Sequence, residues 1–118
     1  MALFPCIIGS SGGTSIIDDG YYLLMGTSTP VSQHKITSGG SFQVTVVSGA
    51  TKAALINCKN ASASSLSITS STATCYVIGI KNNKETYNAG FTSGSVSLSS
   101  YDYVLIIGGN GSKTFTFN

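Results

Sequence analysis

A strict alternation between apolar and polar side chains is the feature that most constrains the fold of this chain. Four segments show it, and their apolar members are Phe42, Val44 and Val46; Leu66 and Ile68; Val96 and Leu98; and Phe115 and Phe117. Successive side chains of a β-strand point to opposite faces of a sheet, so each segment predicts a strand with one buried and one solvated face. We therefore expect a protein built mainly of half-buried strands.

Three further segments, residues 21–25, 75–80 and 103–107, are apolar at nearly every position. Strands that are buried on both faces have this composition, which predicts that these three lie in the interior of a sheet. Residues 53–58 are a weaker strand candidate. The alanines within residues 47–59 leave a short helix as the alternative there.

Residues that tolerate a positive φ separate the expected strands. They form the motifs Ser-Gly-Gly at 38–40, Ser-Gly-Ala at 48–50, Lys-Asn-Asn-Lys at 81–84 and Gly-Gly-Asn-Gly at 108–111. The chain length of 118 residues is that of one domain. The sequence thus predicts an all-β fold over residues 21–118, a single antiparallel β-sandwich of jelly-roll or immunoglobulin-like type with about nine strands.

Residues 1–20 differ in composition from the rest of the chain. An apolar stretch is followed by Gly-Ser-Ser-Gly-Gly at 9–13, and the region ends in an Asp-Asp-Gly turn at 18–20. This pattern is typical of an arm that docks on another surface through a flexible spacer, and an ordinary first strand followed by a loop is the alternative. If the region is an arm, its expected assembly contacts are Phe4, Pro5, Ile7, Ile8, Ile16 and Ile17.

Charged side chains make up only 8% of the chain, and its net charge is +2 at pH 7. Six lysines without an arginine form no basic stripe, so we expect no nucleic-acid partner. No apolar run approaches the roughly 20 residues that cross a bilayer, so we expect no membrane partner. Exposed sheet edges are usually protected by lysine or proline, and both are scarce here. We therefore expect a homo-oligomer whose copies cover one another's edges.

Catalytic and metal-binding groups are sparse in the sequence. His34 is the single histidine and stands beside a lysine in a polar stretch, where a solvated side chain is expected rather than a general base. No serine lies in a Gly-x-Ser-x-Gly motif, and Asp18 and Asp19 supply too few ligands for calcium. We expect no enzyme activity, no metal and no cofactor.

The three cysteines, Cys6, Cys58 and Cys75, form no metal-binding pair. An odd number of cysteines in apolar surroundings predicts buried thiols in a protein made in a reducing cytoplasm. A disulfide between Cys58 and Cys75 is the alternative.

Sugar binding is the alternative function. β-Sandwich lectins stack aromatic rings on sugars, and this chain has six tyrosines but no tryptophan. Tyrosines within strands are more often core residues. Tyr87, in the sequence Tyr-Asn-Ala-Gly-Phe, is the best candidate for the glycan contact of a carbohydrate-binding module or adhesin.

The chain resembles the accessory virion proteins of tailed bacteriophages, such as head-decoration, head-fibre and tail-attached β-domains. The resemblance lies in the small Ser/Thr/Gly-rich β-domain, the opening Met-Ala-Leu-Phe-Pro and the ending at residues 101–111. It implies a non-enzymatic, symmetric oligomer, with a trimer favoured, that binds capsid or tail proteins. It also implies a virion location after synthesis in the bacterial cytoplasm. A virion structural protein is therefore the leading expectation.

Overall fold

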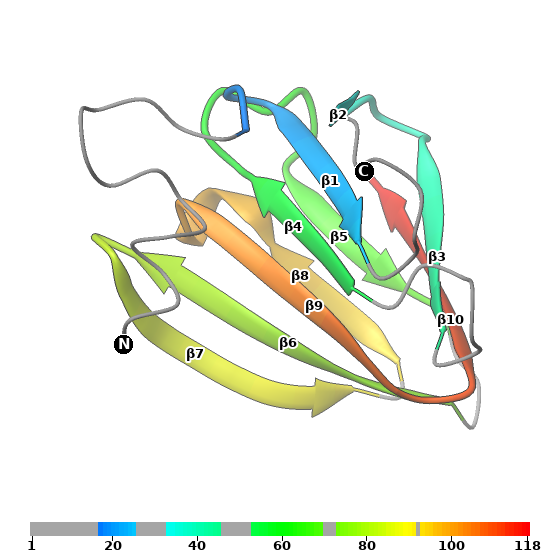
Figure 1. Cartoon of the computed structure of the whole chain (residues 1–118). Coiled ribbons are helices and arrows are strands. Elements are labelled where there is room, and N and C mark those ends of the chain that lie inside the picture. Colours follow the sequence, from blue (N-terminus) through cyan, green and yellow to red (C-terminus); the bar gives the residue numbers. More distant parts are fainter. Residues whose placement is uncertain (1–16, 26–32, 46–52, 70–72, 92) are drawn as a thin grey trace.

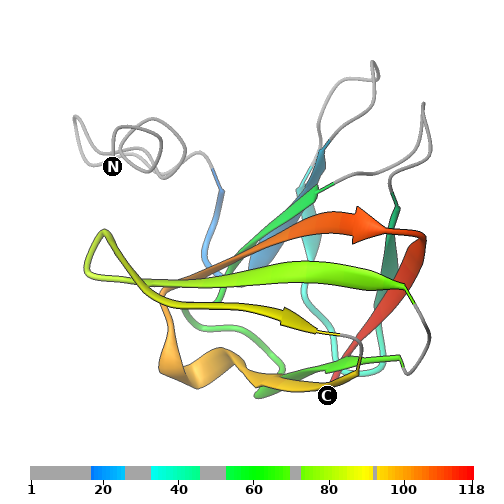
Figure 2. The same ribbon diagram turned by 90° about the horizontal axis from the view of Figure 1, so that it is seen from below.

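The structure, a computed structural model, describes residues 17–25, 33–45, 53–69, 73–91 and 93–118. In these ranges the chain forms two antiparallel sheets that face each other, as two perpendicular views show (Figure 1 and Figure 2). The six-stranded sheet has the order β2 (Gln33–Lys35), β1 (Tyr21–Met25), β4 (Ala53–Asn57), β9 (Tyr103–Asn110), β6 (Thr74–Lys81) and β7 (Lys84–Phe91). The four-stranded sheet has the order β3 (Ser41–Thr45), β10 (Ser112–Phe117), β5 (Ser65–Ile68) and β8 (Gly94–Ser97), and the 3-10 turn η2 (Leu98–Ser100) follows β8.

The prediction of an all-β antiparallel sandwich is confirmed. Ten strands lie in the described residues, against the expected number of about nine. The weaker candidate at residues 53–58 forms strand β4, so the helical alternative is wrong over the described part of that segment. Strands β2 and β7 lack the apolar alternation and are not predicted by it.

The two kinds of sequence pattern separate the strands into the two sheets. The four alternating segments supply β3, β10, β5 and β8, which together are the whole four-stranded sheet. Of their apolar members, Leu98 begins the turn η2 instead of extending β8, and Val46 lies outside the described residues. The three segments that are apolar at nearly every position form β1, β6 and β9 of the six-stranded sheet, and none of them is an edge strand, as predicted. The four-stranded sheet therefore has a solvated outer face, whereas the six-stranded sheet has apolar side chains on both faces.

Aromatic rings fill one end of the core between the sheets. Phe42 stacks on Phe115 with ring centroids 5.2 Å apart, and Tyr22 of β1 lies 5.1 Å from Phe117. Aliphatic side chains of β4, β6 and β9 fill much of the remaining core. The three phenylalanines are the apolar members of alternating segments, so the alternation alone places them in this core.

A tight hairpin joins β6 to β7. Asn82 and Asn83 have φ values of 54° and 62°, the left-handed conformation of a two-residue hairpin turn, and the turn predicted at residues 81–84 is correct. Gly79 of β6 lies against the ring of Tyr101, where a Cβ atom would be only 2.4 Å from the ring atom Cε1. Any side chain at this position would therefore have to displace the ring of Tyr101.

Cys58 and Cys75 are buried and are not joined to each other, so the alternative of a disulfide between them is wrong. Cys6 lies outside the described residues. Burial, with a smaller contribution from the charge of Asp102, raises the pKa of the Cys58 thiol to about 12. A thiol in this environment stays protonated, and therefore inert, at neutral pH.

Candidate functional site

The outer face of the six-stranded sheet, which points away from the four-stranded sheet, is apolar across four neighbouring strands. Its side chains come from alternate positions of β1, β4, β9 and β6: Tyr21, Leu23, Met25, Ala53, Leu55, Tyr103, Leu105, Ile107, Tyr76, Ile78 and Ile80. The register aligns Leu23, Leu55, Leu105 and Ile78 in one row across the sheet. The outer face of an antiparallel sheet is commonly solvated and polar, so this second apolar face needs a covering layer.

This outer face has a buried part and an exposed end. Leu55 has no exposed surface and Leu105 is 5% exposed, whereas Ile107 is 39% and Tyr76 53% exposed. The last two are neighbours, because the register pairs Tyr76 of β6 with Ile107 of β9. Tyr76 and Ile107 therefore form an apolar patch, the exposed end of the outer face.

The ring of Tyr76 lies beside bare backbone on both neighbouring strands. A Cβ atom on Gly109 of β9 would be 3.1 Å from the ring atom Cε2, and a Cβ atom on Gly90 of β7 would be 3.9 Å from Cδ1. Glycine at both positions leaves room for the ring to lie across the sheet. An aromatic ring held in this way offers an apolar surface to a partner.

Ile17 is the one described member of the buried cluster on this face that lies outside a strand. Asn57 holds it in place, because its Nδ2 donates hydrogen bonds to the carbonyl oxygen of Ile17 at 3.0 Å and to Oδ1 of Asp19 at 3.1 Å. Asn57 is fully buried, and its Oδ1 accepts a hydrogen bond from the backbone N–H of Lys59 at 3.1 Å. Ile17 is therefore fixed to the outer face of the six-stranded sheet by the side chain of Asn57.

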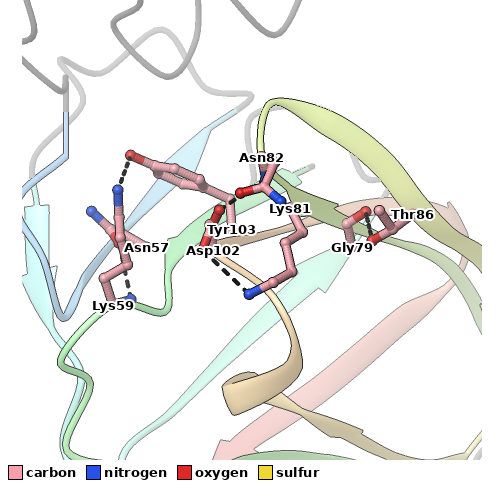
Figure 3. Close-up of polar contacts among 8 residues, drawn as sticks. All are labelled: Asn57, Lys59, Gly79, Lys81, Asn82, Thr86, Asp102 and Tyr103. Atoms are coloured by element: carbon pink, nitrogen blue, oxygen red, sulfur yellow. Dashed lines mark hydrogen bonds and ion pairs between the residues drawn. The ribbon is translucent and has the colours of Figure 1, made fainter.

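Polar contacts border the outer face at the end of the strands opposite its exposed end (Figure 3). The ammonium group of Lys59 lies 4.8 Å from the ring centroid of Tyr103 and 3.4 Å from its hydroxyl. Asp102 accepts a hydrogen bond from the backbone N–H of Asn82 at 3.0 Å and lies 4.0 Å from Nζ of Lys81. Because Lys81 is half exposed, this ion pair contributes little to stability.

Of the predicted assembly contacts, Ile17 alone lies within the described residues. The others, which lie outside them, are Phe4, Pro5, Ile7, Ile8 and Ile16. Ile17 is fully buried in the outer-face cluster of its own chain.

The predicted glycan contact, Tyr87, lies on the opposite side of the sheet from Tyr76. It pairs with Gly79, and its ring centroid is 5.9 Å from that of Tyr101, so its side chain is partly buried at the margin of the core. Sequence reasoning missed Tyr76 as a surface residue because it belongs to a segment that is apolar at nearly every position. No local pattern marks it, because the glycines beside its ring, Gly90 and Gly109, belong to neighbouring strands that pair with β6.

The other candidate groups are dispersed. His34 is exposed on β2, with its ring 5.4 Å from that of Tyr22. The part of the chain that the structure describes brings together no three His, Cys, Asp or Glu side chains that could hold a metal ion. An open groove is lined by Cys58, Asn60, Ala61, Ser62, Ala63, Ser64, Ser99 and Asn118. These described lining residues include neither an aromatic ring for a sugar nor an acid or base for catalysis.

No protein-family model, no curated protein and no solved structure matches this chain. Within the described ranges, no helix has the length and apolar character needed to cross a membrane. The outer face of the six-stranded sheet is therefore the strongest guide to function.

Proposed function

We propose that this chain is a non-enzymatic structural protein of a bacteriophage virion, which forms a homo-oligomer and binds capsid or tail proteins. The observation that supports this proposal most strongly is the apolar outer face, with Tyr76 and Ile107 exposed at one end. Removing such surface from water in a contact is favourable by about 25 cal/mol per Å². Contiguous apolar surface on a folded domain is typical of an interaction site.

The edge strands support association in the same way. Strands β3 and β8, the two edges of the four-stranded sheet, contain no charged residue. Unprotected edges pair readily with other chains, so a monomer with these edges is prone to association. A symmetric oligomer, of which a trimer is the expected form, would use neighbouring copies to cover them.

The proposal can be tested by analysing the protein content of virions that are purified from cells carrying the gene. Quantitative mass spectrometry with a labelled standard should find the protein in a fixed ratio to a major capsid or tail protein. The paired substitutions Tyr76→Asp and Ile107→Asp should leave the domain folded, because both side chains are exposed, but should remove the protein from the particles. Ser100→Asp, at an exposed position of the 3-10 turn η2 and outside the edge strands, is the matched control and should be incorporated normally. A protein found in the lysate and absent from the particles contradicts the proposal.

A carbohydrate-binding module or adhesin is the second candidate, and the exposed ring of Tyr76 between two glycines favours it. Such a ring can stack on the apolar face of a sugar. A glycan array with the purified protein tests this function, with Tyr76→Ala and Tyr87→Ala as paired variants. Loss of the signal in Tyr76→Ala alone supports a sugar site on the outer face, whereas the absence of any glycan signal counts against it.

A further inference from the structure

We infer that copies of this protein join head to tail, with edge strand β8 of one copy paired antiparallel to edge strand β3 of the next. This inference rests on the proposed homo-oligomer and names the strands that join its copies. Within the described ranges, β3 pairs only with β10, and β8 only with β5. The backbone N–H and C=O groups along the other side of such a strand can pair with a strand of another chain.

The charged residues of the edge strands are confined to the six-stranded sheet. Its edges carry Lys35 in β2, and Lys84 and Glu85 in β7. Charged side chains, and lysine above all, keep an edge strand from pairing with another chain. Strands β3 and β8 have no charged residue, and the exposed residues of β8 are only glycine and serine. The two edges of the four-stranded sheet therefore lack this protection.

The strand directions fit a pairing between β8 and β3 of different copies. Neighbouring strands of the four-stranded sheet are antiparallel, so β3 and β8, its first and fourth strands, run in opposite directions. A rotation about an axis along the strands keeps these directions and brings β8 of one copy beside β3 of the next as an antiparallel pair. Because this contact joins two different surfaces, a rotation that closes gives a ring in which both edges of every copy are covered. A two-fold pairing of β8 with β8 would leave the β3 edges open.

The alternation of buried and exposed side chains sets the register of this pairing. When Val96 faces Phe42, the whole of β8 lies opposite residues 41–44 of β3. Both side chains are buried in the core between the sheets, so the apolar layer continues from one copy to the next. The same arrangement occurs within the sheet, where Leu66 of β5 faces Val96. A shift by one residue would place an apolar side chain opposite a polar one.

The edge pairing adds to the apolar contact at Tyr76 and Ile107. A strand of four residues supplies few hydrogen bonds, whereas association has to offset the freedom that the two copies lose. The apolar patch lies on the other sheet and contributes buried apolar surface. The oligomer therefore needs both contacts, and a charge at either one should separate the copies.

Cysteine cross-linking of the full-length chain tests the inference. Every variant carries Cys6→Ser, so that the buried Cys58 and Cys75 are the only native cysteines. Ser95 of β8 faces Gln43 of β3 in the inferred register, and both are exposed. Within one chain these strands are three spacings, or about 14 Å, apart, which a short bis-maleimide does not span. The double variant Ser95→Cys/Gln43→Cys should form cross-links between copies up to the full oligomer on a denaturing gel, whereas Ser95→Cys or Gln43→Cys alone should remain a single chain.

The matched control combines Gln43→Cys with Asn88→Cys. Asn88 is exposed and pairs with Ile78 on the outer face of the six-stranded sheet, so this variant should give no cross-link. Cross-linking of either single variant would overturn the inference, because it would show that like edges meet about a two-fold axis.

Native mass spectrometry separates failure of the edge pairing from failure of the proposed oligomer. A double variant that is oligomeric but forms no cross-links would overturn the edge pairing and leave the homo-oligomer standing. A monomeric wild type would refute the oligomer and the edge pairing together.

Discussion

Replacement of Asn57 by alanine tests how the start of the described domain is fixed to the outer face. The side chain is fully buried and makes three hydrogen bonds, to the carbonyl of Ile17, the carboxylate of Asp19 and the N–H of Lys59. A neutral hydrogen bond contributes about 1 kcal/mol net, and one to a charged group about 1.5–3 kcal/mol. Because the Ile17 carbonyl also loses its partner in a buried site, we expect Asn57→Ala to lower the free energy of unfolding by about 3 kcal/mol.

Urea unfolding, followed by far-ultraviolet circular dichroism, measures this loss. With a typical slope of 1–3 kcal/mol per M, about 3 kcal/mol lowers the midpoint by roughly 1–3 M. Asn57→Asp should be at least as destabilising, because it keeps the acceptor for the N–H of Lys59 but directs a carboxylate at the Ile17 carbonyl and at Asp19. Asn88→Ala, at an exposed position of β7, is the control and should change the stability by less than about 0.5 kcal/mol. A loss below about 0.5 kcal/mol in Asn57→Ala would refute the role assigned to this side chain.

Three further predictions concern packing, backbone conformation and pH. Gly79→Ala should lower the free energy of unfolding by about 1–3 kcal/mol, because the added Cβ atom would lie 2.4 Å from the ring of Tyr101. In a double-mutant cycle, Tyr101→Ala should relieve much of that loss. Gly39→Ala should cost about 1 kcal/mol although nothing lies within 4 Å, because its φ is +90°; a thermal melt measures the shift. The Cys58 thiol has a pKa of about 12 when folded and 9.0 as its ordinary value, so its stabilising contribution should be full below pH 9 and be lost as the pH rises toward 12. Urea midpoints at several alkaline pH values should therefore fall less steeply in Cys58→Ala, and equal slopes would contradict the assignment.

The strands of the four-stranded sheet, which have one buried and one solvated face, could be predicted from the sequence. Phe42, Phe115 and Phe117 are core residues because serine, threonine or glutamine occupies the intervening positions, and only one face of such a strand can be buried. The hairpin turn at Asn82 and Asn83 was equally clear, because few residues other than glycine, asparagine and aspartate accept its backbone conformation.

The candidate site could not be predicted in the same way. A segment such as residues 75–80 shows that both faces of a strand are apolar, but it does not show which layer covers each face. The exposure of Tyr76 depends on its neighbours Gly90 and Gly109. These glycines are far from Tyr76 in the sequence, and the pairing of the strands brings them beside it. The hydrogen bond from Asn57 to Ile17 joins residues 40 positions apart, and no local pattern predicts such a contact.

The edge strand β7 was missed for a related reason. Its sequence, Lys-Glu-Thr-Tyr-Asn-Ala-Gly-Phe, has no regular apolar alternation, and most of its side chains described by the structure are exposed. Its place in the sheet comes from the tight turn and from backbone pairing with β6. Backbone hydrogen bonds of this kind make no demand on side-chain hydropathy.

Native mass spectrometry over a range of protein concentrations tests most directly whether the exposed end of the outer face joins copies of this protein. The wild type and the control Ser100→Asp are expected to form the same oligomer, with a trimer as the favoured form. The pair Tyr76→Asp and Ile107→Asp, which adds charge to the apolar patch, is expected to be monomeric at the same concentrations. A monomeric wild type, or an oligomer unchanged by the Tyr76 and Ile107 substitutions, would contradict the role of this surface.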